Sequence, residues 1–147
     1  PEARIKKFIE MRGADGGPWR RICALPALWV GLTYDQTALD AAWDLCRGWT
    51  AEEREAFRVS AAEEGLAGTV AGRPVLDVAR EVVDLAEAGL KARARPGAGG
   101  LIPDESHFLA PLREAVERGE TPADELLRRF EGEWGGDFAG LYAAEAY

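Results

Sequence analysis

Apolar residues recur through the middle of the chain at the spacing of an α-helix. The clearest stretch follows Pro74, where apolar side chains return every three or four residues: Val75, Val78, Ala79, Val82, Val83, Ala86 and Leu90. This spacing places them on one face of a helix, and proline is well tolerated in the first helical turn. The pattern therefore predicts a long helix that starts at Pro74 and buries one face.

A shorter helix is predicted ahead of it, in the segment 37–49. Its apolar positions have the same helical spacing: Leu39, Ala42, Trp43 and Cys46. Asp35 precedes the segment and is expected to cap this helix, and Gly48 provides a stop signal.

Cap and proline signals mark further helices. Thr50, with Glu53 three residues later, forms a capping-box pattern, in which each side chain can bond the other residue's amide. Thr121 followed by Pro122 is typical of a helix start. Another helix is predicted just before it, over 106–119.

The first dozen residues are compatible with two structures. Ile5 and Ile9 fit one face of a helix, but together with Met11 they also fit one face of a strand. Side chains alternate along a strand, so this choice would place Glu10 and Arg12 together on the opposite face. We favour the strand, and the helix stays open as the alternative.

These patterns predict an α+β fold in which helices dominate and one or two strands lie near the N-terminus. The glycines and prolines of residues 91–106 predict a flexible surface loop or hairpin. We divide the chain into residues 1–35, which hold a strand, a glycine-rich loop and an apolar connector, and a helical region over 36–147. The two regions are expected to form one structural unit.

The charge and hydropathy of the chain exclude two classes of partner, nucleic acids and membranes. The 147 residues include 26 acidic and 18 basic side chains, which gives a net charge of −8. Such a surface repels nucleic acid and anionic lipid, and no apolar run approaches the roughly 20 residues needed to span a bilayer. We expect no nucleic-acid partner, no membrane association and a cytoplasmic location. Cys23 and Cys46 match no metal-binding spacing and are interpreted as buried or idle thiols.

Glu10 and Arg12 are the first candidates for chemistry. A carboxylate is a hard oxygen ligand suited to Mg²⁺, and a guanidinium can bind a phosphate or a carboxylate through two parallel hydrogen bonds. Phosphoryl transfer needs both kinds of group. On spacing alone, an ordinary surface or cross-strand salt bridge is the competing interpretation.

The residues after this pair read as a turn that leads into an apolar run. The glycines of 13–17 permit tight backbone conformations, and Trp19 can either line a pocket or fasten the loop to the core. Arg20 and Arg21 can either contact phosphate or solvate an edge. The apolar run that follows includes Trp29, which is expected in the core.

At this point the sequence resembles a known family. The similarity is carried by EMRGADGGPWRRICALPALWVGLTYD at residues 10–35, LDAAWDL, WTAEERE, FLAPLREAVERGETPADELL and the C-terminal GEWGGDF. These runs resemble the C-terminal part of glutamate–cysteine ligases, most closely the form found in plants and many proteobacteria. The similarity extends over essentially the whole chain.

The resemblance implies an ATP-dependent ligase with a fold similar to glutamine synthetase. Such enzymes join the γ-carboxylate of glutamate to the amine of cysteine through an acyl phosphate, the first step of glutathione synthesis, with ATP and Mg²⁺ as cofactors. They are several hundred residues long. The resemblance therefore implies that this chain works with an N-terminal portion of the same protein and is inactive alone. An unpaired edge strand is prone to pair with another chain, so a homodimer is a further candidate assembly.

The resemblance also implies roles for individual residues. Glu10 would be a metal ligand, and Arg12 a catalytic and substrate-binding residue that contacts phosphate. Trp19 would lie against the glutamate substrate. Arg20 and Arg21 are the candidates for nucleotide contact.

Two other functions stay open. A related γ-glutamyl ligase would keep this chemistry with a different amine substrate. A helical interaction module would instead use an apolar helix face to dock a partner, without catalysis.

Overall fold

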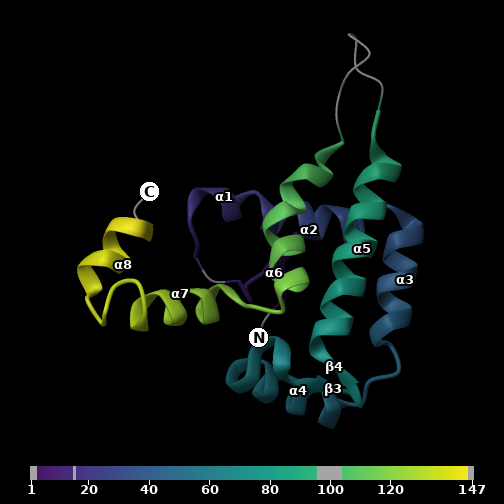
Figure 1. Cartoon of the computed structure of the whole chain (residues 1–147). Helices are drawn as coiled ribbons and strands as arrows, with labels where there is room; N and C mark the ends of the chain where they lie inside the picture. The colour runs from purple at the N-terminus through teal and green to yellow at the C-terminus, as the bar shows by residue number, and fades with distance from the viewer. Residues whose placement is uncertain (1–2, 15, 96–103, 146–147) are drawn as a thin grey trace.

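Helices make up most of the chain in the computed structural model, which describes residues 3–14, 16–95 and 104–145 (Figure 1). In chain order the elements are β1 (Ala3–Ile5), β2 (Ile9–Met11), α1 (Trp19–Ile22), α2 (Ala24–Thr33), α3 (Gln36–Cys46), α4 (Ala51–Glu64), η1 (Gly65–Ala67), β3 (Thr69–Val70), β4 (Arg73–Pro74), α5 (Val75–Arg93), η2 (Glu105–Leu109), α6 (Ala110–Arg118), α7 (Pro122–Glu131) and α8 (Phe138–Glu145). The strands form two antiparallel pairs, β1–β2 and β3–β4. The predicted helix-dominated α+β fold is confirmed.

The main core lies where α2 packs against the long helix α5. Its buried residues come from α2, α5 and η2: Ala27, Leu32, Ala86, Leu90 and Leu109, with Trp29 packed against them. The two helices approach closely because glycines face each other. A Cβ atom built on Gly89 would lie 1.9 Å from the carbonyl oxygen of Gly31, and one on Gly31 would lie 2.2 Å from the carbonyl oxygen of Ala86. Only residues without a side chain permit this backbone contact.

A second cluster fills the other end of α5. It contains Val70, Val75 and Val78, with Trp49 and Phe57 packed against them. The sequence did not predict the β3–β4 hairpin, which ends at the predicted helix start. Its turn has positive φ angles at Ala71 (47°) and Gly72 (76°), the conformation that suits a two-residue hairpin.

The predicted caps are confirmed. Asp35 accepts a hydrogen bond from the Ala38 amide at 2.9 Å and caps α3. Thr50 forms the expected capping box at the start of α4. Thr121 forms a second box with Asp124 at the start of α7, with Pro122 in the first turn.

The helices around the glycine- and proline-rich segment differ from their predicted bounds. α5 continues to Arg93, so it includes the first residues of the predicted loop. Residues 96–103 of that loop lie outside the described residues. The helix predicted over 106–119 begins as the 3₁₀ turn η2 and continues as α6.

The C-terminal helices form an arm at one side of the molecule. α7 and α8 lie away from the α2–α5 core (Figure 1), and their main mutual contact joins the rings of Phe130 and Phe138 at 4.8 Å. Leu127, Phe138 and Tyr142 are exposed along this arm. Among the described residues, no helix is long and apolar enough to cross a bilayer.

Candidate functional site

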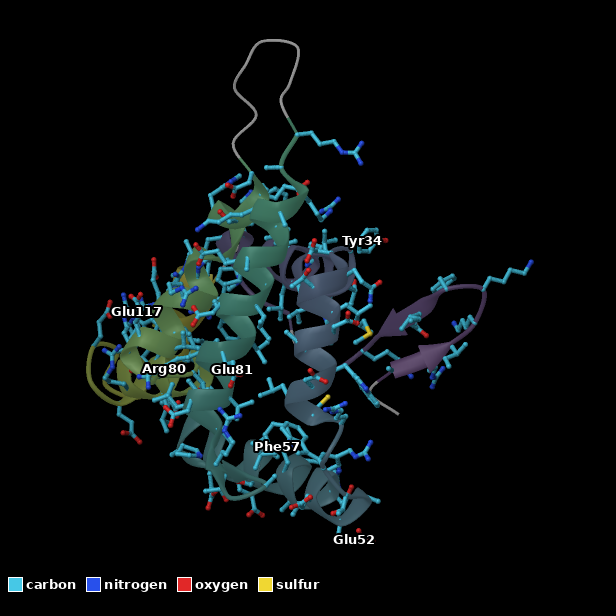
Figure 2. The ribbon with its side chains drawn as sticks, turned by 90° about the vertical axis from the view of Figure 1, so that its right-hand side faces the viewer. Tyr34, Glu52, Phe57, Arg80, Glu81 and Glu117 are labelled. Atoms are coloured by element: carbon cyan, nitrogen blue, oxygen red, sulfur yellow. The ribbon has the colours of Figure 1, made fainter. Side chains whose placement is uncertain are left out.

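The N-terminal hairpin carries the first candidate residues. β1 and β2 pair antiparallel, with Arg4 opposite Glu10 and Ile5 opposite Ile9. Strand structure is therefore confirmed for this region, but as a hairpin, because Ile5 lies on β1 and not on the strand that holds Ile9 and Met11. The hairpin projects from the helices (Figure 2), and Ile5 and Ile9 are 91% and 70% exposed. A two-stranded ribbon with an unburied apolar face has little stability of its own.

Glu10 and Arg12 are not a pair on one strand. β2 ends at Met11, so Arg12 already belongs to the loop that follows, where it is exposed. Glu10 instead lies 3.3 Å from Lys6 through its Oε2 atom, and that oxygen is enclosed without forming a hydrogen bond. Within the described part of the chain, Arg12 forms no hydrogen bond or ion pair with another residue. The competing interpretation, an ordinary surface salt bridge, describes Glu10, whose partner is Lys6, but it does not describe Arg12.

Glu10 alone meets only part of the requirement for a metal site. No group of three or more His, Cys, Asp or Glu side chains that could hold a metal occurs among the described residues. Mg²⁺, however, commonly takes one or two protein carboxylates and keeps several water ligands. Glu10 fits such a role as one ligand among several only when the Lys6 ammonium, 3.3 Å from its Oε2 atom, moves away.

Trp19 opens the short helix α1 directly after the glycine-rich loop. Its side chain is 77% exposed, so it does not fasten the loop to the core. α1 contains four residues, has no side-chain N-cap and buries none of its residues. A ring held outward in this way is available to a ligand or a partner surface.

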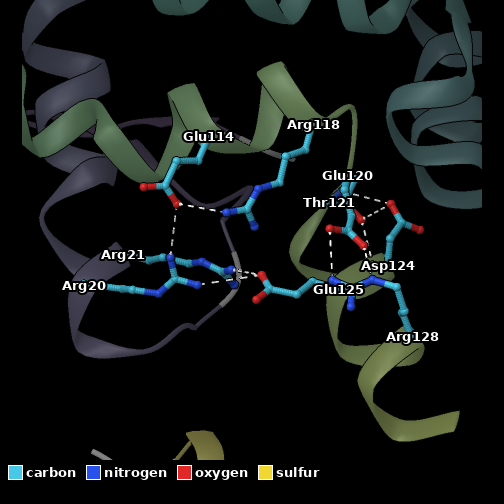
Figure 3. A network of polar contacts seen from close by, with 9 residues as sticks. All are labelled: Arg20, Arg21, Glu114, Arg118, Glu120, Thr121, Asp124, Glu125 and Arg128. Atoms are coloured by element: carbon cyan, nitrogen blue, oxygen red, sulfur yellow. Dashed lines mark hydrogen bonds and ion pairs between the residues drawn. The ribbon is translucent and has the colours of Figure 1, made fainter. Parts of the chain in front are cut away.

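Arg20 and Arg21 face carboxylates from the far end of the chain (Figure 3). Arg21 Nη2 donates to Glu125 Oε2 at 2.6 Å, and each of these side chains is 20% exposed. Arg20 lies between two carboxylates, 3.6 Å from Glu114 Oε2 and 3.7 Å from Glu125 Oε2. These contacts link the segment after the glycine-rich loop to α6 and α7.

Sequence reasoning missed Glu114 and Glu125. Glu125 lies 104 residues after Arg21, and no local pattern connects the two positions. Acidic side chains at the start of a helix are common, because they oppose the positive end of its dipole. Glu125 therefore looked like an ordinary first-turn residue of α7.

A cleft lies beside the same loop. Its volume is about 850 Å³, and it separates the loop and α2 from the end of α4 and the start of α7. Gly16 and Gly17, Leu25 and Leu28, and Thr121 are among the residues that line it. Arg21 also lines the cleft, and its ion pair joins α1 to Glu125 of α7, which is not among the lining residues.

The chain matches glutamate–cysteine ligases over nearly all of its length. Glutamate–cysteine ligase, chloroplastic, of Arabidopsis thaliana is 47% identical over 135 residues, which are 92% of this chain and 24% of that protein. The proteins of the same name from Nicotiana tabacum and Solanum lycopersicum are 45% and 44% identical over the same shares. The chain thus spans about a quarter of the length of the curated relatives it matches.

The names of these relatives correct one expectation. All three are described as chloroplastic, which points to a plastid. The cytoplasmic location expected from charge and hydropathy is therefore wrong. Net charge and hydropathy indicate only whether a protein surface is compatible with water. They do not distinguish one aqueous compartment from another.

The family model agrees with these relatives. The model for glutamate-cysteine ligase family 2 (GCS2) matches residues 1–144, which include the hairpin, the glycine-rich loop, α1 and the carboxylates of α6 and α7. The resemblance seen in the sequence is confirmed, because both the family match and the identities cover the same residues. The chain belongs to glutamate-cysteine ligase family 2.

Proposed function

We propose that the chain is part of an ATP-dependent ligase that joins the γ-carboxylate of L-glutamate to the amine of L-cysteine, the first step of glutathione synthesis. The observation that carries this proposal is the continuous family match over residues 1–144. The relatives are about four times as long as the matched segment, so we assign the activity to a longer protein. We expect the 147 residues alone to be inactive.

The hairpin, loop and α1 supply the residues that we assign to the site. Glu10 would hold Mg²⁺ as one ligand, and the metal would neutralise phosphate oxygens when bound. Arg12 would contact the phosphate that is transferred, and Trp19 would lie against glutamate. Arg20 and Arg21 would contact the nucleotide. Exposure of Arg12 and Trp19 supports these roles, because both side chains are free to meet a ligand.

Charge is the main contribution that this segment can make. In acyl phosphate chemistry the γ-carboxylate is phosphorylated, and the amine then displaces phosphate. Both steps develop negative charge on phosphate oxygens, and fixed cationic donors near those oxygens stabilise the transition state. Among the described residues of the loop and α1, Arg12 is the guanidinium with no carboxylate partner, so it is the best candidate for this contact.

The exposed hairpin supports the assignment to a longer protein. Ile5, Ile9 and Met11 form an apolar face that the described residues leave largely in solvent. We expect residues of the same protein outside this chain to pack on that face and pair with the free strand edges. A homodimer, in which a second copy covers the face, is distinguished by measuring the mass of the complete protein in solution.

An activity assay of the complete protein tests the proposal. ATP, Mg²⁺, glutamate and cysteine should give γ-glutamylcysteine and one phosphate per peptide bond, measured by mass spectrometry and phosphate release. Alanine and glycine in place of cysteine should react much more slowly. Faster turnover with another amine would assign a related γ-glutamyl ligase. No ATP-dependent product with any amine would leave the helical interaction module as the better description. Product formation by the 147 residues alone would contradict their dependence on a longer protein.

A further inference from the structure

We propose that Glu125 is a positioning residue of the nucleotide-binding segment: it holds the guanidinium groups of Arg20 and Arg21 in place beside the glycine-rich loop. This inference rests on the proposed function, and it adds a residue that lies on α7, far from the loop in sequence. Glu125 is not expected to contact a substrate. It acts through the two arginines.

The contacts single out Glu125 from the other carboxylates of the network (Figure 3). Its Oε2 atom lies 2.6 Å from Arg21 Nη2 and 3.7 Å from Arg20 Nη2, so one oxygen serves both guanidinium groups. Glu125 and Arg21 are each only 20% exposed. Glu114, by comparison, is 49% exposed and lies 3.6 Å from Arg20. A short, sheltered contact loses less to solvent screening than an exposed one.

α1 needs such a contact because it cannot fix its own direction. It has four residues, no side-chain cap and no buried residue. Four residues are far too few for a stable isolated helix, because nucleation of the first turn is unfavourable. α2 follows α1 directly and therefore fixes the position of the last residue of α1. The ion pairs with α6 and α7 fix the positions of Arg20 and Arg21.

Exposure leaves one of the two arginines able to bind an anion, because the Arg20 side chain is 51% exposed. Arg20, Arg21 and Arg118 face two carboxylates, Glu114 and Glu125. The network of Figure 3 also includes Glu120, Asp124 and Arg128, so its four arginines are balanced by four carboxylates. Without Glu125, the adjacent guanidinium groups of Arg20 and Arg21 would repel each other and point apart. The carboxylate thus keeps two cations together, while the half-exposed Arg20 guanidinium stays accessible to phosphate.

The variant Glu125→Gln in the complete protein tests this role. Glutamine keeps the shape of the side chain but removes its charge. We expect the KM for ATP to rise about tenfold, the loss expected for one charge-assisted hydrogen bond. The KM for glutamate and the melting temperature should change little. Glu125→Asp, which keeps the charge on a shorter side chain, should recover part of the affinity for ATP.

Two further carboxylates provide matched controls. Glu114→Gln removes the exposed contacts to Arg20 and Arg118 and leaves Arg21 paired with Glu125. We expect the KM for ATP to rise about two- to threefold. Glu55→Gln removes an ion pair with Arg58 inside α4, and it should leave both KM values unchanged. Equal effects of all three variants would contradict a specific role for Glu125.

A charge-exchange variant tests whether Glu125 positions the arginines for ATP or only stabilises the fold. The double variant Arg21→Glu with Glu125→Arg can reform an ion pair but moves the positive charge to α7. Positioning predicts a melting temperature near that of the wild type with a KM for ATP that stays high. If Glu125→Gln lowers the melting temperature without changing the KM for ATP, Glu125 is only a brace and the proposal is wrong.

A second measurement does not depend on activity. In protein labelled with 5-fluorotryptophan, the ¹⁹F resonance of Trp19 can be assigned with Trp19→Phe. Glu125→Gln should shift or broaden this resonance, because Trp19 directly precedes the two arginines, and Glu55→Gln should not. An unchanged resonance would overturn the positioning role. A wild-type protein that does not use ATP would instead overturn the proposed function, so the two failures are distinct.

Discussion

The α2–α5 core and the N-terminal segment are held in place by different forces. In the core, Gly31 and Gly89 bring two helix backbones into contact, and Ala86 and Leu90 are fully buried beside them. In the N-terminal segment, Ile9 and Trp19 are largely exposed, and ion pairs to α6 and α7 supply the long-range contacts. The core depends on shape and burial, whereas the segment with the candidate chemistry depends on charge.

This difference has a consequence for function. Residues that bind ligands must remain accessible, so they cannot be fixed by burial. The segment of residues 9–22 meets that condition by anchoring Arg20 and Arg21, and it leaves Arg12 and Trp19 exposed. We therefore expect substitutions in the two regions to separate activity from stability.

The largest effect is expected from Arg12→Ala in the complete protein. Loss of one cationic contact to the transition state should lower kcat by about 10²- to 10³-fold, while the melting temperature stays the same. Glu10→Gln should reduce turnover similarly if it is a metal ligand. Arg47→Ala, which removes an exposed arginine at the end of α3, is the control. Unchanged turnover in both site variants would remove this segment from the catalytic site.

Gly89→Ala should instead affect stability. The added Cβ would meet the Gly31 carbonyl oxygen, whose backbone cannot move without separating α2 from α5. We expect a loss of about 3 kcal/mol in the free energy of unfolding, measured by urea denaturation. Gly48→Ala is the matched control, because no atom lies within 4 Å of its added Cβ. A loss for Gly48→Ala as large as that for Gly89→Ala would contradict the close-contact explanation.

Much of the core was predictable because its signals are local. The stripe from Val75 to Leu90 and the caps at Thr50 and Thr121 each depend on residues within a few positions. The β3–β4 hairpin was missed because strands of two residues are too short to show alternation. The glycine contact between Gly31 and Gly89 was missed because each residue alone has no distinguishing pattern.

The candidate site was predictable in its residue types but not in its contacts. Glu10, Arg12 and Trp19 stood out by chemistry and by family resemblance. The strand end at Met11 and the ion pair between Glu10 and Lys6 depend on how the hairpin turns. The partners of Arg20 and Arg21 come from helices about 100 residues later, and only the folded chain brings them together. Long-range charge pairs leave no periodic signal in a single sequence.

A smaller and local effect is expected from Thr121→Ala. The Thr121 hydroxyl accepts from the Asp124 amide at 3.1 Å, and the Asp124 carboxylate accepts from the Thr121 amide at 2.9 Å. Loss of this cap should cost about 1 kcal/mol. Hydrogen exchange should become faster in the first turn of α7 and stay unchanged in α2, because the arm lies apart from the core. Thr37→Ala, at an exposed position of α3, should have no such effect. Equal acceleration in α2 would show that the arm and the core unfold together.

The smallest effect concerns acid stability at the surface of the core. Glu87 accepts hydrogen bonds from Lys91 and, at 2.6 Å, from Arg113 Nη2, and these bonds hold the pKa of Glu87 below its ordinary value of 4.5. With the pKa lower in the folded state, the unfolded chain binds the proton first as the pH falls. The stabilisation is therefore complete above about pH 4.5 and is lost as the pH drops through the lower folded pKa.

Glu87→Gln should consequently lower the melting temperature by about 1–2 °C at pH 7, a modest loss because the pair is near the surface. The difference from the wild type should shrink below pH 4, where the wild-type carboxylate is itself becoming neutral. Glu117→Gln removes an exposed carboxylate that forms no ion pair among the described residues, and it should show no such convergence. A difference that stays constant from pH 7 to pH 3 would mean that Glu87 contributes by packing. The surface of the core would then be stabilised by packing, as its interior is, and charge would stabilise only the N-terminal segment.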